Sequence, residues 1–157
     1  MKTLNSSIDA LDARILDLLA ASARATMADI ARQLGMSSPS VTERVRRLEA
    51  DGVIRGYALD LDPARLGYPL TAIVRIRAVP GRLKDVEARI QATPECVECD
   101  KVTGEDCYVA RVLLRSIQHL DEVLEPFADC AETNSSIVKA TPVRKRLPPL
   151  WEPAPRE

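Results

Sequence analysis

The sequence predicts an α+β chain, because the spacing of its apolar residues changes partway along. From Ile8 to about Leu48, apolar residues recur at the three- and four-residue intervals of amphipathic helices. From Leu70 onward, segments rich in β-branched residues alternate with two helical stretches in the order βαββαβ. The first pattern is typical of a winged helix-turn-helix unit. The second is typical of a ferredoxin-like unit, in which an antiparallel sheet carries helices on one face.

Three short helices and a wing-like strand are predicted over residues 8–57. The first two helices carry apolar stripes at Ile8, Leu11, Ile15, Leu18 and Leu19, and at Met27, Ile30, Ala31 and Leu34. Gly35 then supplies the backbone freedom for a tight turn. Ser38 suits the N-cap of a third helix and Pro39 suits its first position, so this helix should begin near residue 39.

The third helix, within SSPSVTERVRRLEADG, has the two faces expected of a helix that reads DNA. Val41, Val45 and Leu48 fall on one side and should pack against the first two helices. The other side presents hydroxyls and arginines, which suits the major groove, where Arg reads guanine edges and Ser or Arg holds phosphate. A solvated helix face is the alternative interpretation. The candidate DNA-binding residues are Ser38, Ser40, Thr42, Glu43, Arg44, Arg46 and Arg47.

The second half of the chain predicts a sheet with one bare face. The expected strands are Leu70–Val79, Cys96–Thr103, Cys107–Arg115 and Ser135–Val143. The expected helices carry their apolar faces at Leu83, Val86 and Ile90, and at Ile117, Leu120, Leu124 and Phe127. The uncovered face, which carries Ile73, is either a dimer surface or a solvated sheet with scattered apolar residues.

Composition limits the class of protein. Of the 157 residues, 46% are hydrophobic, enough for packed cores in one domain or two small ones. No run approaches the roughly 20 apolar residues of a membrane span, and no signal pattern opens the chain, so we expect a cytoplasmic protein without a membrane partner. Residues 1–60 hold eight Lys/Arg and eight Asp/Glu, so one copy should bind DNA weakly and depend on multimers.

Cysteine and histidine content argues against catalysis and metal binding. Cys96 and Cys99 form a C-x-x-C, but residues three apart on a regular strand point to opposite faces, so the thiols would converge only across a bulge. Cys107 and Cys130 lack metal-like spacing, and His119 is the only histidine. We therefore expect reduced thiols, no metal, no cofactor and no catalytic residue.

The C-terminal segment RKRLPPLWEPAPRE has four prolines after Leu147 and no periodicity, so an irregular tail is expected over residues 148–157. Arg144, Lys145 and Arg146 form a basic run that either touches DNA or is a solvated terminus. Trp151 either docks on a neighbour or belongs to a weakly ordered tail.

These blocks resemble the leucine-responsive/asparagine regulator (Lrp/AsnC) family over roughly residues 8–147. The N-terminal helices resemble its DNA-binding domain, DPARLGYPLTAIVRI the entry into its second domain, and VTGEDCYVARV the loop around small effectors. The resemblance implies a transcriptional regulator, not an enzyme. Its expected parts are a helix-turn-helix domain (1–60), a linker (61–69), an effector-binding and oligomerisation domain (70–147) and a tail (148–157).

The resemblance also implies a small amino-acid effector bound between dimers. An ammonium needs a carboxylate or carbonyls, a carboxylate needs N–H groups, and glycine permits close backbone approach. The family pattern has Asp immediately before the Tyr, where this chain has Cys107, and the alternative is an ordinary hairpin turn at Gly104. Polar residues near the start of the last strand either line the same site or are ordinary strand positions. The candidate effector-binding residues are Val102, Thr103, Gly104, Glu105, Asp106, Cys107, Tyr108, Thr133, Ser135 and Ser136.

The expected partners are double-stranded DNA, a small amino acid, and further copies of the chain in homodimers that assemble into higher oligomers such as an octamer. Two alternatives stay open. One is an effector-independent architectural protein that wraps DNA, and the other is an enzyme like the sirohaem-pathway decarboxylases, which look similar across both halves. Such an enzyme needs acid–base groups in a deep pocket, whereas this chain has one histidine and an intact RVRRLE helix.

Overall fold

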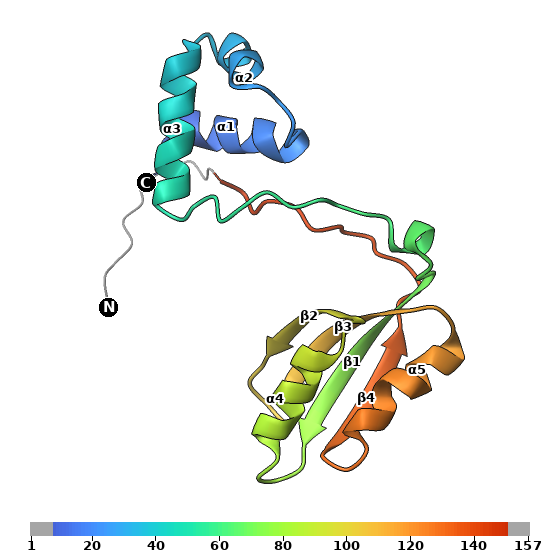
Figure 1. Ribbon diagram of the computed structural model, residues 1–157. Coiled ribbons are helices and arrows are strands. Elements are labelled where there is room, and N and C mark those ends of the chain that lie inside the picture. Colours follow the sequence, from blue (N-terminus) through green and yellow to red (C-terminus); the bar gives the residue numbers. More distant parts are fainter. Residues whose placement is uncertain (1–7, 151–157) are drawn as a thin grey trace, which may run out of the picture. The chain divides into compact units, whose positions relative to one another are not determined.

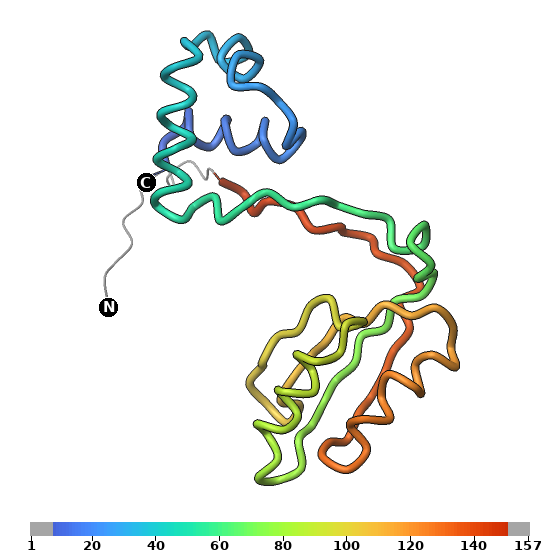
Figure 2. The backbone as a smooth tube through the Cα atoms, viewed as in Figure 1, coloured from blue at the N-terminus to red at the C-terminus, as the bar shows by residue number. Residues whose placement is uncertain are grey.

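The computed structural model describes residues 8–150, and its N-terminal part consists of three helices around a small apolar core (Figure 1). The helices are α1 (Ala10–Ala21), α2 (Met27–Leu34) and α3 (Ser38–Ala50). The short turn between α2 and α3, visible in Figure 2, contains Gly35 with a φ of 64°, a left-handed conformation that favours glycine. The predicted apolar stripes supply the core, whose buried members are Ile15, Leu19, Ile30, Ala31, Val41 and Val45.

The wing-like strand expected after the third helix is not paired into a sheet. Within residues 8–59 the structure contains no strand, and the chain beyond α3 runs without a ladder partner. Ile54 anchors the start of this segment, because its N–H donates to the Leu48 carbonyl at 3.0 Å and its side chain packs against the core. Beyond it, Tyr57 and Leu59 are exposed.

Residues 60–142 form a four-stranded antiparallel sheet with α4 and α5 on one face (Figure 1). The strands lie in the order β2-β3-β1-β4, which confirms the ferredoxin-like βαββαβ arrangement. A 3₁₀ turn at Pro63–Leu66 precedes the first strand, and another at Glu125–Phe127 follows α5. The elements are β1 (Leu70–Ala78), α4 (Leu83–Ala92), β2 (Cys96–Lys101), β3 (Tyr108–Leu114), α5 (Ile117–Leu124) and β4 (Ala131–Ile137).

The core of the sheet lies under the helices and follows the strand alternation. Ala72, Val74 and Ile76 of β1 are buried, as are the alternate residues of β3, and Val86 and Val123 cover them from α4 and α5. The residues between them point to the opposite face, which no helix covers within the described part of the chain.

The last strand lies earlier than the Ser135–Val143 expected from composition. β4 starts at Ala131, beside the buried Cys130, and pairs with β1 from Ala78 back to Ala72. After Ile137 one more bond follows, from the Val138 N–H to the Thr71 carbonyl at 2.8 Å. The partner strand ends there, so the apolar and β-branched residues that follow have nothing to pair with.

The C-terminal segment packs with the three-helix unit. In the structure residues 143–150 group with that unit, and the second-domain boundary at residue 147 stays a prediction. The sheet has already ended at Ile137, and Leu147 and Leu150 line a groove whose other side is α1. Trp151 lies outside the described residues. In residues 8–150, no helix has the length and apolar character needed to cross a membrane.

Candidate nucleic-acid interface and effector loop

The start of α3 is fixed by Ser37, one residue before the expected cap. The Ser37 hydroxyl accepts a hydrogen bond from the Ser40 N–H at 3.3 Å, and the two hydroxyl oxygens lie 2.8 Å apart. Ser38 is therefore the first helical residue and Pro39 the second, where its missing N–H removes no helical bond. Thr42 is bound to its own helix, because its hydroxyl donates to the Ser38 carbonyl at 2.9 Å.

The two faces of α3 are placed as predicted. Val41, Val45 and Leu48 are buried against the other helices. Ser40 and Glu43 are exposed, as are Arg46 and Arg47, whereas Ser38, Thr42 and Arg44 are half-buried. The outward set is therefore smaller than the set named from the sequence.

A buried carboxylate on α1 holds two of the three arginines of α3. The Asp12 side chain is only 1% exposed. Its two oxygens accept hydrogen bonds from Arg44 Nη1 at 2.8 Å and from Arg47 Nη2 at 2.6 Å. Arg44 Nη1 also donates to Asp9 Oδ2 at 2.6 Å. These pairs fasten α3 to the first turn of α1, because charge-assisted hydrogen bonds are the strong ones.

The acidic pair on α1 also forms the cap of that helix. The Asp9 side chain accepts from the Asp12 N–H at 2.8 Å, and Asp12 accepts from the Asp9 N–H at 3.2 Å. The hydrogen bond from Arg44, helped by the Asp12 amide, lowers the pKa of Asp9 below its usual value. The same contacts, with Asp9 first and Asp12 second, raise the pKa of Arg44, so both members of the pair stay charged near neutral pH.

This network separates the three arginines by role. Arg44 is 24% exposed and bound on two sides, which makes it a structural residue. Arg47 is 51% exposed and bound on one side, so its outer edge is open to a ligand. Arg46 is exposed and forms no ion pair with any residue between 8 and 150.

Sequence reasoning missed the two acids, although a signal for Asp12 was present. Asp12 precedes Ile15 by three residues and Leu19 by seven, so it occupies the same face as these core positions. An acidic residue on a core stripe implies a buried cationic partner, because an unpaired buried carboxylate is costly.

The second candidate site, the loop over residues 102–107, closes the β2–β3 hairpin. The Val102 N–H donates to the Cys107 carbonyl at 3.0 Å, and the Cys107 N–H donates to the Ile76 carbonyl of β1 at 2.9 Å. Gly104 has a φ of 115°, a conformation that L side chains rarely adopt. Residues 102–105 are exposed, and Asp106 and Cys107 are half-buried.

The acids of this loop lie against arginines of β1 on the open face of the sheet. Glu105 pairs with Arg77 at 2.8 Å, and Asp106 lies 3.9 Å from both Arg75 and Arg77. Arg77 also reaches Glu132 of β4 at 3.8 Å. The loop therefore offers a ligand both signs of charge, with no carboxylate free of a cation.

Tyr108 lies away from these charges, beneath α4. Its ring is 3% exposed, and its hydroxyl donates to Glu87 of α4 at 2.9 Å. Burial, followed by the hydrogen bond to Glu87, raises the pKa of Tyr108. Lys101 lies over its ring at 5.5 Å. A single chain therefore uses Tyr108 as a core residue.

The polar residues of β4 do not join the loop within one chain. Thr133 pairs with Ile76 and Ser135 with Val74, which places both on the helix side of the sheet. Ser136 pairs with Ile73 and lies on the open side. All three are exposed on an edge strand. Tyr108, Ile76 and Thr133 form one row across three strands, so Thr133 lies two strand spacings, about 9.6 Å, from Tyr108.

Strand β2 contains the bulge that is needed to bring both thiols of the C-x-x-C motif to the same face of the sheet. The pairing of β2 with β3 shifts between Cys96 and Glu98, so Cys96 faces Val112 and Cys99 faces Ala110. Both thiols thus point to the helix-covered face and pack against the core as free cysteines. Burial raises the pKa of Cys96, and burial with the neighbouring Cys96 raises that of Cys99 to about 11. Among the described residues, no group of three His, Cys, Asp or Glu side chains is arranged to hold a metal ion.

The only histidine of the chain has structural contacts. His119 is 8% exposed, and its Nδ1 accepts from the Arg115 N–H at 3.2 Å. Its Nε2 lies 3.6 Å from a Glu95 oxygen. Both ring nitrogens are thus engaged within the second unit, away from the loop that carries Gly104.

Comparison with known proteins covers both units. Residues 71–148 match the model of the Lrp/AsnC ligand binding domain, and residues 8–55 match a winged helix-turn-helix DNA-binding model. The HTH-type transcriptional regulator LrpA of Mycobacterium tuberculosis is 35% identical over 141 residues, which cover 88% of this chain and 94% of that protein.

Two solved structures have the same fold over most of their length. LrpC of B. subtilis gives a TM-score of 0.82 at 28% identity, covering 87% of this chain and 98% of that one. A feast or famine regulatory protein from M. tuberculosis, solved with L-methionine, gives a TM-score of 0.82 at 33% identity, covering 90% of this chain and 98% of that one.

Proposed function

The chain belongs to the Lrp/AsnC family of transcriptional regulators, and from that membership we propose that it binds DNA sequence-specifically through α3 and responds to a small amino acid. The observation that carries the DNA part is the buried Asp12, which orients α3 by holding Arg44 and Arg47 while Arg46 stays exposed. A recognition helix must be held rigidly on its domain, because base readout depends on side chains kept in fixed positions relative to the DNA.

We assign the DNA contacts of α3 to its exposed residues. Arg46 and the outer edge of Arg47 contact bases or phosphates, and Ser40 contacts phosphate at the start of the helix. Arg44 supports them from behind. Glu43 disfavours DNA sequences that lack a hydrogen-bond donor at its position. Its carboxylate repels phosphate and accepts hydrogen bonds only from bases that present a donor, such as cytosine.

The DNA contact is tested with Arg46→Ala in the full chain, measured by fluorescence anisotropy on preferred and unrelated duplexes. A base contact predicts a loss of about 1–3 kcal/mol on the preferred duplex alone, and a phosphate contact predicts a uniform loss with a salt slope smaller by about one. The matched control is Lys84→Ala, an exposed cation of α4. Equal affinity of Arg46→Ala and the control on both duplexes would remove α3 from the proposal.

We propose further that the open face of the sheet forms a homodimer, which brings two copies of α3 to one pseudo-palindromic site. Half-buried apolar residues, Ile73 of β1 with Val109 and Leu113 of β3, lie on this face among charged ones. Sedimentation of the full chain should give a dimer or a larger assembly, such as an octamer of four dimers. Ile73→Asp should dissociate it, whereas Ile117→Asp, an exposed position on α5, should not. A wild-type monomer at micromolar concentration would contradict this proposal.

The effector proposal rests on the loop at Gly104 and on the L-methionine complex of the structural relative. Glu105 or Asp106 pairs with the ligand's ammonium and backbone N–H groups near Gly104 with its carboxylate, while Cys107 gives the wall a less polar character. Since Arg75 and Arg77 already oppose the two acids, binding requires these side chains to share or move. The second chain of an interface completes the site.

Calorimetry across the proteinogenic amino acids tests the sensor. At least one should bind the wild type, and Gly104→Arg should abolish that binding while DNA affinity stays nearly unchanged. A ligand alters regulation only if it prefers one assembly over another, so DNA affinity is measured with and without it. If no amino acid binds, the chain acts as an effector-independent architectural DNA-binding protein, and the sensor proposal fails.

A further inference from the structure

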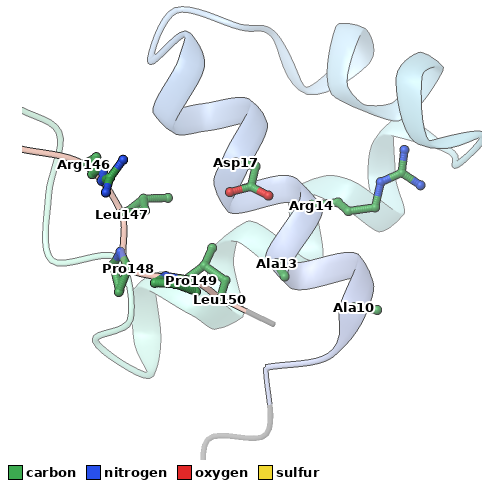
Figure 3. A pocket seen from close by; sticks show the side chains of 9 residues that line it. All are labelled: Ala10, Ala13, Arg14, Asp17, Arg146, Leu147, Pro148, Pro149 and Leu150. Atoms are coloured by element: carbon green, nitrogen blue, oxygen red, sulfur yellow. The ribbon is translucent and has the colours of Figure 1, made fainter. Parts of the chain in front are cut away.

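Residues 143–150, which we call the arm, add positive charge to the three-helix unit. Residues 143–150 belong to that unit rather than to the sheet that precedes them in sequence. Leu147, Pro149 and Leu150 line one side of a groove of about 680 Å³ (Figure 3), and Ala13 and Asp17 of α1 line the other. Two consecutive prolines in this stretch restrict the backbone, which lowers the entropy lost when the segment is held against α1.

The three cations of this segment have no acidic partner within residues 8–150. Arg144, Lys145 and Arg146 are exposed, and none of them forms an ion pair with another residue of the described chain. Residues 143–150 contain no Asp or Glu. By contrast, residues 1–60 hold eight acidic and eight basic side chains, and two arginines of α3 are committed to Asp12. The arm therefore gives an otherwise balanced unit an excess of positive charge.

The arm lies one helix away from the recognition surface. Successive residues of α1 are turned by about 100°, so Ala10, Ala13, Arg14 and Asp17 point to the side of α1 opposite Asp12. Asp12 contacts α3, and the opposite side of α1 faces the arm across the groove. The separation is thus about one helix diameter, roughly 10 Å. Phosphates beside a major groove of about 12 Å width lie within reach of cations at that spacing.

We propose that Arg144, Lys145 and Arg146 form a second DNA contact, which binds backbone phosphates of the same duplex that α3 reads. The proposal rests on the proposed function of α3. Its ligand chemistry is the phosphodiester backbone and not the bases, because three adjacent exposed cations that form no ion pair within residues 8–150 recognise charge rather than base edges. Leu147 and Leu150 dock the arm on α1 and so hold the cations in place.

The test removes the three charges from the full chain with Arg144→Gln, Lys145→Gln and Arg146→Gln together. Anisotropy is measured on preferred and unrelated duplexes over a range of salt. Each phosphate contact contributes about 0.9 to the slope of log affinity against log salt, so the slope should fall by about 2–3. Affinity near 0.1 M salt should fall at least about tenfold, by the same factor on both duplexes. The matched control removes three exposed cations of the second unit, namely Arg65, Lys84 and Lys101, by the same substitution.

A second variant separates docking from charge. Leu147→Asn keeps the net charge of the segment but removes an apolar side chain that lines the groove beside α1, so it should reproduce part of the affinity loss of the triple variant. If the triple variant and its control have equal slopes while Arg46→Ala weakens binding, the arm is refuted and the proposed function stands. If wild type binds no duplex at all, the proposed function fails, and the arm with it.

Discussion

Replacing Asp12 with Asn should destabilise the three-helix unit more than any other single charge removal on α1. The carboxylate accepts two charge-assisted hydrogen bonds, at 2.8 Å from Arg44 and 2.6 Å from Arg47. Each such bond contributes about 1.5–3 kcal/mol when buried. Arg44 is 24% exposed and Arg47 51%, so both regain water when released, and we take the lower end. The expected loss is about 2–3 kcal/mol in the stability of this unit.

Hydrogen exchange read by mass spectrometry measures this loss locally, without requiring the whole chain to unfold in two states. Protection of α1 and α3 amides should fall about 30–150-fold, because each 1.36 kcal/mol is a factor of ten. Protection of β1 and β3 should not change. The control is Asp17→Asn, an exposed acid on the same helix with no ion pair among residues 8–150. A decrease below threefold, or one equal to that of Asp17→Asn, would refute the interpretation of Asp12 as the anchor of α3.

Three further predictions follow from single residues. Because Ser37 is the N-cap of α3, Ser37→Ala should lower the free energy of unfolding by about 1 kcal/mol, and Ser38→Ala by less than half of that. Thermal unfolding measures both losses. Equal losses would place the cap elsewhere. Arg89 holds the pKa of Asp129 at about 2, below its ordinary value of 3.8, so the stability that this pair adds above pH 4 should be lost as pH falls towards 2. Asp129→Asn should flatten that part of the acid unfolding curve, and an unchanged curve would contradict the pairing. Alkylation of Cys99 should be slow at neutral pH and rise up to pH about 11, and rapid labelling at pH 7 would contradict its burial.

Local sequence patterns were sufficient for most of the fold. The three helices, the hairpin and the order of the strands follow from periodicity, because each element buries one face against a core that the pattern reveals. The predicted bounds of the last strand were wrong because composition favoured residues after Ser135, whereas β4 needs β1 beside it and β1 begins only at Leu70. The segment after α3 forms no strand for the same reason, because no partner strand lies beside it within residues 8–59. Pairing partners are a property of the whole fold, and composition does not specify them.

The candidate site was less accessible to sequence reasoning, because its contacts join distant residues. Arg44 and Arg47 were grouped with Arg46 by helix position, yet the first two bind Asp12, more than thirty residues earlier in the chain. Tyr108 follows the effector loop in sequence, and strand alternation turns its ring into the core of a single chain, so its role toward an effector stays a prediction. The C-x-x-C geometry depended on one bulge, which the sequence did not mark.

Selection of duplexes from a random pool by the full-length protein tests the central claim, that α3 reads DNA sequence, most directly. We expect enrichment of a pseudo-palindrome whose half-sites are about 10 bp, or a multiple of that, apart, because two copies of α3 must face the same side of the duplex. Arg46→Ala, selected in parallel, should enrich a different or weaker sequence. A wild-type pool that stays random after repeated rounds would contradict sequence reading by α3.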